Sequence, residues 1–159
     1  MVRTQVDKSG WGEGPWNDEP DRLDFRHVGF ACLMLRNARY GNWCGYVGVP
    51  ADHQAYGKAY DEVDVKCHGG LTYGRKCDGE HICHVPESGE SDDLFWFGFH
   101  CNNEWDIAPG SEAYLRTTGL DYRDLGRTYR DVRYVRKEVK RLAEQLKTLH
   151  ERRPVVSPR

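Results

Sequence analysis

The densest concentration of chemically capable residues lies between Cys67 and Asp106. These forty residues hold eight of the thirteen cysteines and histidines of the chain: Cys67, His68, Cys77, His81, Cys83, His84, His100 and Cys101. Thiolates and imidazoles in groups of four are the ligands that zinc prefers. One interpretation is therefore a zinc site, for which the candidate ligands are Cys77, His81, Cys83, His84 and His100.

The spacing of these residues argues against a standard zinc site. No C-x-x-C pair occurs, and each adjacent Cys/His pair would point to opposite faces of a strand, so that it offers one ligand to a given site. The alternative is that the thiols pack as small apolar side chains. Because we expect a cytosolic protein, we expect reduced thiols or metal ligands rather than disulfides.

The segment Lys66–Tyr73, K-C-H-G-G-L-T-Y, has the composition of a binding loop. Its two glycines let backbone approach a ligand closely, and its His, Thr and Tyr side chains suit a phosphate, ribose or base edge. It matches neither common phosphate-binding pattern, and a plain turn between strands is the alternative. With aromatic residues that could stack on a base, the predicted ligand-binding set is Tyr46, His68, Gly69, Gly70, Thr72, Tyr73, His84, Trp96 and Asp106.

Polar residues also cluster after the aromatic run Leu94–Phe99, where a loop is held by a rigid strand. A nucleophilic Cys101 oriented by His84 or His100 is one interpretation, although structural thiols are commoner. The enzymatic alternative is a metal-dependent hydrolase with a bound water. Its residues would be His68, His84, His100 and Asp106.

The elements that position these residues are mostly strands. Apolar, aromatic and β-branched runs bounded by Gly, Pro and Asn predict strands at 27–35, 43–49, 63–67, 81–85 and 94–99. The first two would form a hairpin through the turn at 37–42. Short helices are expected at 50–58 and 109–119. The sequence therefore predicts an α+β fold with an antiparallel meander of about five strands.

A C-terminal amphipathic helix is predicted from Thr128 to His150, with Thr128 and Asp131 as a weak capping box. Its apolar stripe consists of Val132, Val135, Val139, Leu142, Leu146 and Leu149. The stripe packs either on the sheet or as a homodimeric coiled coil, and fewer than three heptads favour the sheet. The basic outer face, with Arg133, Arg136 and Lys140, offers another hypothesis, inhibition of a host protein.

The length of 159 residues is that of one domain, which we place at 21–150, between an irregular segment (1–20) and a tail (151–159). The formal net charge of −2 gives no general attraction to nucleic acid or anionic membranes. The N-terminus has no apolar signal region and no run is long enough to span a bilayer. We expect a cytoplasmic protein.

Several motifs together resemble a family of small uncharacterised proteins encoded by tailed bacteriophages. They are E-P-D at 19–21, L-D-F at 23–25, W-C-G-Y-V at 43–47, H-G-G-L-T-Y at 68–73, C-H-V-P at 83–86 and W-F-G-F at 96–99. In that family the last motif continues as G-F-D-x-x-H-x-x-D. Here His100 and Asn103 replace the first Asp and the His, and only Asp106 matches, which puts any shared polar site in doubt.

The resemblance implies an accessory protein in the bacterial cytoplasm and brings no established activity. With no recognisable nucleophile beside its base, ligand binding is the leading hypothesis, and the metal-dependent hydrolase stays the alternative. The leading hypothesis is a counter-defence protein that sequesters a small, nucleotide-derived signal. Zinc is the one cofactor that the sequence suggests.

Overall fold

The computed structural model describes residues 6–77, 82–84, 86, 88–119 and 126–152. Its strands are β1 (Arg22–His27), β2 (Phe30–Arg36), β3 (Trp43–Pro50), β4 (Tyr73–Lys76) and β5 (Leu94–His100). Its helices are α1 (Pro109–Thr117) and α2 (Val132–Glu151), with short 3-10 turns η1 (Pro15–Asp18) and η2 (Tyr60–Glu62).

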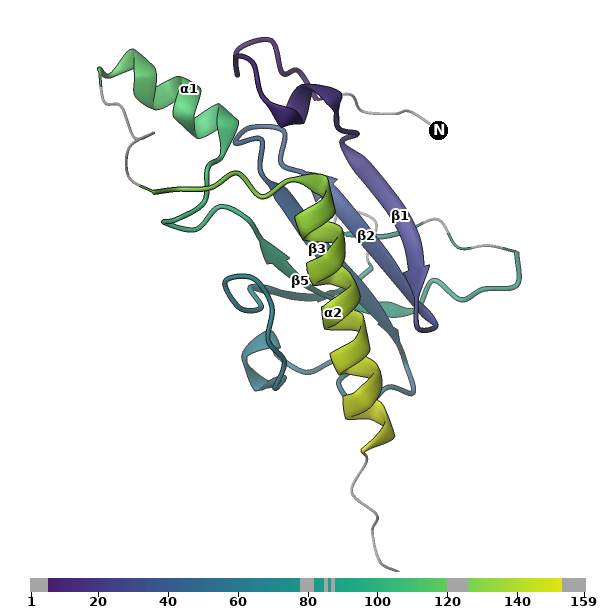
Figure 1. Ribbon diagram of the computed structural model, residues 1–159. Coiled ribbons are helices and arrows are strands. Elements are labelled where there is room, and N and C mark those ends of the chain that lie inside the picture. Colours follow the sequence, from purple (N-terminus) through teal and green to yellow (C-terminus); the bar gives the residue numbers. More distant parts are fainter. Residues whose placement is uncertain (1–5, 78–81, 85, 87, 120–125, 153–159) are drawn as a thin grey trace, which may run out of the picture.

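The five strands form one antiparallel sheet in the order β1-β2-β3-β5-β4. The first three strands are a meander, and β5 then inserts between β3 and β4. Helix α2 lies across one face of the sheet, while α1 projects beyond the end of the strands (Figure 1). The α+β fold, the antiparallel sheet and the helix laid on it are confirmed.

Strand alternation gives the sheet two different faces. Trp43, Val47 and Val49 of β3 pack in the main core with α2, whereas Tyr46 packs in a smaller cluster on the other face with Leu33 and Trp96. No helix covers that second face in the part of the chain described. Leu33 and Trp96 are nonetheless fully buried on that face, because Tyr73, Cys77 and Ile82 pack against their cluster, whereas Cys44 and Tyr46 remain partly exposed there.

The apolar stripe of α2 is used within the chain. Val135, Val139, Leu142 and Leu146 have no exposed surface, and Val132 and Leu149 pack against the same core. The homodimer seam predicted from these six residues is therefore wrong, because their side chains are already buried on the sheet. The helix begins after Asp131, whose side chain accepts a hydrogen bond from the Tyr134 amide at 2.9 Å.

Two predicted strands are loops. Val63–Cys67 alternates apolar and polar residues as a strand would, but the backbone N–H and C=O of Lys66 both bond to the Gln145 carboxamide of α2, at 2.7 Å each. A side chain thus takes the place of a neighbouring strand. Ile82–His84 is not a strand either, and residues 81 and 85 lie outside the described residues.

Other boundaries also differ from the prediction. The segment 50–58 forms consecutive turns instead of a helix. Strands β1 and β4 were missed because both are edge strands in which half of the residues are exposed and none is buried, which weakens the apolar signal. The hairpin of β2 and β3, strand β5 and helix α1 agree with the sequence.

The N-terminal segment is bound to the domain through the buried Arg36 at the end of β2. Its Nε donates to Asp21 (2.8 Å), and its two terminal nitrogens donate to Glu19 (3.1 Å), the Pro20 carbonyl (3.3 Å), the Gly41 carbonyl (2.8 Å) and the Tyr129 hydroxyl (2.9 Å). These five hydrogen bonds match the five donors of a guanidinium.

Glu19 extends this network to α2 and the core. It accepts hydrogen bonds from the Tyr129 hydroxyl (2.5 Å), the Trp43 indole (3.2 Å) and the first amide of α2, that of Val132 (2.8 Å). Burial is the largest cause that raises the pKa of Tyr129, and the hydrogen bond from Tyr129 to Glu19 raises this pKa further. The pKa of Asp21 is lowered, because bonds from Lys8, Val6 and Arg36 outweigh its partial burial.

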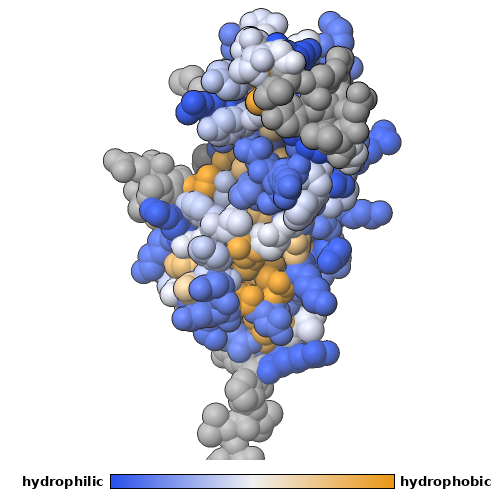
Figure 2. Space-filling view, turned by 90° about the vertical axis from the view of Figure 1, so that its left-hand side faces the viewer, coloured by the Kyte–Doolittle hydropathy of each residue, from blue (hydrophilic) through white to orange (hydrophobic). Residues whose placement is uncertain are grey.

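Outside the core, the surface is mainly hydrophilic. Figure 2 shows hydrophilic side chains over most of one side of the molecule, with hydrophobic atoms in a strip in its lower half. Among the described residues, the large hydrophobic side chains that are exposed are Tyr40, Tyr60, Trp105 and Tyr114. Neither described helix combines the length and apolarity needed to cross a membrane.

Replacing Arg36 with Met should destabilise the protein by about 3–5 kcal/mol, because Glu19 and Asp21 would keep partly buried charges without their partner. Urea unfolding followed by circular dichroism measures this. Arg22→Met is the matched control, since Arg22 forms an exposed pair with Asp24 and should cost about 1 kcal/mol or less. Equal effects of the two substitutions would contradict the role assigned to Arg36.

Candidate functional site

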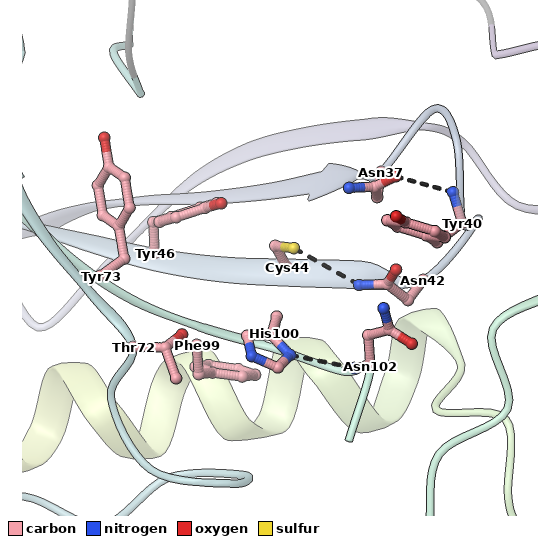
Figure 3. Close-up of a pocket in the computed structure, with 10 residues that line it drawn as sticks. All are labelled: Asn37, Tyr40, Asn42, Cys44, Tyr46, Thr72, Tyr73, Phe99, His100 and Asn102. Carbon is pink, nitrogen blue, oxygen red and sulfur yellow. Dashed lines mark hydrogen bonds between the residues drawn. The ribbon is translucent and has the colours of Figure 1, made fainter. Parts of the chain in front are cut away.

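A pocket of about 440 Å³ opens on the sheet face opposite α2. Figure 3 shows its lining side chains, which come from β3, β4, β5, the turn between β2 and β3, and the loop residues Thr72 before β4 and Asn102 after β5. They are Asn37, Tyr40, Asn42, Cys44, Tyr46, Thr72, Tyr73, Phe99, His100 and Asn102. The volume lies within the range of pockets that hold small organic ligands.

Strand register places the aromatic wall of this pocket. Tyr46 and Tyr73 both pair with Gly98 of β5, from opposite sides, and their rings meet edge to face at 5.3 Å. A Cβ at Gly98 would lie 2.3 Å from the Tyr46 ring. Glycine is therefore required here, because any side chain would push the Tyr46 ring away from the sheet.

The turn at 37–42 supplies three of the polar lining residues. The Asn37 carboxamide oxygen accepts from the backbone amides of Arg39 (2.9 Å) and Tyr40 (2.8 Å), which forms the turn. The backbone amide of Asn37 donates to the backbone carbonyl of Asn42 at 2.8 Å, so these two residues close the hairpin side by side. Both carboxamides thus belong to the same wall of the pocket.

Asn42 carries an unpaired buried acceptor. The residue is only 2% exposed, and its Nδ2 donates to the Trp43 carbonyl at 3.2 Å and contacts the Cys44 Sγ at 3.7 Å. Its Oδ1 has no hydrogen-bond partner and no appreciable contact with solvent. Buried acceptors are nearly always paired in folded proteins, so this atom marks a place where a donor is missing.

The pocket has no carboxylate, ammonium or guanidinium group in its lining. Burial raises the pKa of the Cys44 thiol to about 11, and burial also raises the pKa of Tyr46 well above its ordinary value. The walls therefore offer hydrogen-bond donors, hydrogen-bond acceptors and aromatic rings.

A second polar cluster lies on the opposite side of the sheet, beside the start of α2. His68 Nε2 lies 2.9 and 2.8 Å from the two oxygens of Asp106, and its Nδ1 lies 2.7 Å from the Tyr134 hydroxyl. Asp106 also accepts from Arg130 Nε (2.9 Å) and from the backbone and side chain of Asn103 (3.0 Å each). His68 and Asp106 are both buried.

Hydrogen bonds keep the Asp106 carboxylate of this cluster ionised. Burial alone would raise the pKa of Asp106, but hydrogen bonds from His68, Asn103 and Arg130 lower it overall, so the carboxylate is ionised. His68 then donates from Nε2 to this carboxylate, and its Nδ1 forms a hydrogen bond with the Tyr134 hydroxyl. Burial is the largest cause that raises the pKa of Tyr134, which opposes a role as a nucleophile.

The partners of Asp106 come from three segments of the chain, and their hydrogen bonds hold these segments together. We call His68, Asn103, Asp106, Arg130 and Tyr134 the bracing cluster. It connects the 67–70 turn, the 101–106 loop and α2. Gly69 fits this arrangement closely, with a φ of +69° and a position where a Cβ would lie 2.6 Å from the Asn103 side chain. The glycines of the H-G-G motif therefore serve the turn itself, as their positive φ values require.

The predicted ligand-binding set is divided between these sites. Tyr46, Thr72 and Tyr73 line the pocket, whereas His68 and Asp106 belong to the bracing cluster and Gly69 and Gly70 to its turn. His84 and Trp96 lie together on the pocket side of the sheet, with ring centroids 5.5 Å apart, but outside the pocket lining. The structure thus brings together only part of the predicted set.

Seven pocket residues were not predicted as ligand-binding: Asn37, Tyr40, Asn42, Cys44, Phe99, His100 and Asn102. The N-A-R-Y-G-N stretch was interpreted only as turn chemistry, and the alternation of β3 was the signal that would have placed Cys44 beside Tyr46. His100 was predicted as a metal candidate. It faces the pocket, directly across the strand pair from Cys44.

The expectation that all cysteines are reduced is wrong, because Cys77 and Cys83 form a disulfide. These two residues are therefore removed from the zinc candidates, and His81 lies outside the described residues. No group of three or more His, Cys, Asp or Glu in the described ranges is arranged to hold a metal ion. The proposed hydrolase residues are also separated, since His68 and Asp106 lie across the sheet from His100.

Cys101 does not have the surroundings of a nucleophile. It is buried in the main core, on the side away from His100, and burial is the largest cause that raises the pKa of its thiol. A thiol in this state is protonated and inert. The alternative given for it, a structural thiol, agrees with its position.

Comparison with known proteins gives no family. No protein-family model matches the sequence, and searches of curated proteins and of solved structures find no match either. The resemblance to bacteriophage proteins therefore stays a prediction.

Asp106→Asn should destabilise the protein by roughly 3 kcal/mol or more at pH 7, because a buried charged partner of Arg130 and His68 is lost. A carboxylate with a lowered pKa stabilises the fold above its ordinary pKa, and this contribution disappears as the pH falls through the lowered value. The difference in the free energy of unfolding between wild type and variant should therefore shrink below about pH 4.

Urea unfolding at pH 7 and near pH 3 measures the effect. Asp24→Asn is the control, because Asp24 is exposed on β1 and should show little difference at either pH. A difference for Asp106→Asn that does not change with pH would show that Asp106 is not ionised in the folded protein.

Proposed function

We propose that this protein binds a small, nucleotide-derived ligand in the pocket between β3, β5 and the 37–42 turn. The observation that carries the proposal is the buried, unpaired Oδ1 of Asn42 in a pocket wall. An acceptor withdrawn from water without a partner costs free energy, which a ligand donor recovers on binding.

The remaining lining suits a flat, polar and uncharged group. Tyr40, Tyr46 and Tyr73 offer aromatic surface, and His100, Thr72 and Asn102 offer hydrogen-bonding groups. Pockets that bind small molecules combine such apolar walls with a few convergent polar groups. With no Lys or Arg in the lining, any phosphates of the ligand would lie outside the pocket and its base or ribose inside.

Binding without catalysis is favoured over the alternatives. The pocket has no carboxylate, its thiol has a raised pKa, and its one imidazole, that of His100, has no carboxylate beside it in the lining. The basic face of α2 carries no comparable observation, and Arg136 on that face stacks on the Phe25 ring of the same chain at 5.7 Å. Sequestration of a nucleotide-derived signal in a bacterial host, as the bacteriophage resemblance implies, is the role that we propose.

Isothermal titration calorimetry against a panel of nucleosides, cyclic dinucleotides and ADP-ribose derivatives tests this function. We expect saturable binding of at least one member with one site per chain. Asn102→Trp should abolish it, because the exposed Asn102 lines the pocket and a large ring there fills the space.

Glu104→Trp is the matched control, since Glu104 is exposed in the same loop but does not line the pocket. It should bind as the wild type does. Absence of saturable binding to every panel member would refute the proposed function, and equal loss in both variants would show that the pocket is not the site.

A further inference from the structure

We infer that the pocket selects a base whose edge carries an amino group beside an unprotonated ring nitrogen, as adenine and cytosine do. The inference rests on the proposed function and specifies which part of the ligand enters. It follows from two carboxamides, those of Asn37 and Asn42, whose orientations are fixed by their other bonds.

Asn42 is held with its oxygen as the unpaired end. Its Nδ2 donates to the Trp43 carbonyl at 3.2 Å, and rotating the amide by half a turn would place two oxygens against each other instead. The Oδ1 therefore accepts from the ligand, and only an N–H or O–H donor can satisfy it.

The Asn37 carboxamide is held with its oxygen paired and its nitrogen as the end without a bond inside the turn. Two backbone amides of the turn, those of Arg39 and Tyr40, donate to its Oδ1 at 2.9 and 2.8 Å. This leaves its Nδ2 as the end that can donate to a ligand. The backbone amide of Asn37 donates to the backbone carbonyl of Asn42 at 2.8 Å, so the two residues lie opposite each other in the hairpin. Their side chains are therefore neighbours in one wall of the pocket.

The wall thus offers one fixed acceptor beside one donor. The amino group and adjacent ring nitrogen of adenine or cytosine are complementary to this pair, whereas the oxo group and adjacent N–H of uracil have the reverse pattern. Selection by such a pair is strong, because the wrong edge leaves buried groups unpaired.

Tyr40 controls access to the Asn42 oxygen. The Tyr40 ring and the Asn42 carboxamide lie on the same side of the pocket in Figure 3, and the oxygen has no appreciable contact with solvent. Tyr40 is 36% exposed and stands in the turn rather than in a strand, so its ring can be displaced without breaking a strand pairing. Once displaced, the ring can stack on the face of the base.

Calorimetry with matched nucleosides tests the inference: adenosine against purine riboside, and cytidine against its 4-deamino analogue. Each analogue lacks only the amino group. We expect the amino member of at least one pair to bind about ten-fold more tightly, the effect of leaving one buried acceptor unpaired.

Two variants connect the preference to Asn42. Asn42→Ala should reduce the affinity ratio within the pair to about one, because the acceptor is gone, while Asn102→Ala should keep the ratio even if both affinities fall. A loss of folded protein lowers both affinities equally and leaves the ratio unchanged, so the ratio reports on recognition alone.

The failures of the two proposals are distinguishable. Equal binding of both members of each pair, or a ratio that survives Asn42→Ala, overturns this inference and leaves the proposed function standing. Binding of cyclic dinucleotides or ADP-ribose without binding of any nucleoside also overturns this inference and leaves the proposed function standing. Absence of binding throughout the panel overturns both.

Discussion

The arrangement depends on one buried guanidinium, that of Arg36. Its five hydrogen bonds reach the 19–21 segment, the 37–42 turn and Tyr129 before α2. A buried Arg is stable only when every donor is paired and an opposite charge is close, and Glu19 and Asp21 meet both needs. The same bond that holds the Gly41 carbonyl also fixes the turn from which Asn37 and Asn42 enter the pocket.

Strand alternation then separates two polar sites that are close in sequence. His100 and Asn102 line the pocket, whereas Asn103 and Asp106 lie in the bracing cluster with His68. In the bracing cluster, no buried side-chain atom of His68, Asp106 or Tyr134 lacks a hydrogen-bond partner. In the pocket the Oδ1 of Asn42 lacks one, and this difference distinguishes a cluster that stabilises the fold from a wall prepared for a ligand.

The sequence predicted the elements with strong periodicity. The stripe of α2, the apolar hairpin and the aromatic run of β5 each carry a pattern that burial requires, so they could be found without a structure. Edge strand β1 could not, because its outward residues Arg22, Asp24 and Arg26 are charged. Val63–Cys67 imitated a strand because Gln145, far away in sequence, satisfies its backbone.

The candidate site was predictable only in part for a similar reason. Tyr46 and Tyr73 were recognised as aromatic residues that could stack on a base, but the register that places both across Gly98 is a tertiary property. The concentration of Cys and His drew attention to His68, which the fold uses as a brace. Asn42 has no signal in sequence, because an unpaired buried oxygen exists only once its neighbours are in place.

The central claim is that the pocket, and not the His68 side of the sheet, receives the ligand. Two partly buried free thiols report on the two sides, Cys44 in the pocket and Cys67 beside α2, with pKa values raised by burial to about 11 and about 12. The most direct measurement is the rate of alkylation of each thiol by iodoacetamide, with and without saturating adenosine or cytidine, followed by peptide mass spectrometry. The account predicts slower alkylation at Cys44 and an unchanged rate at Cys67. Protection of Cys67 alone, or an unchanged rate at Cys44 with the nucleoside bound, would contradict it.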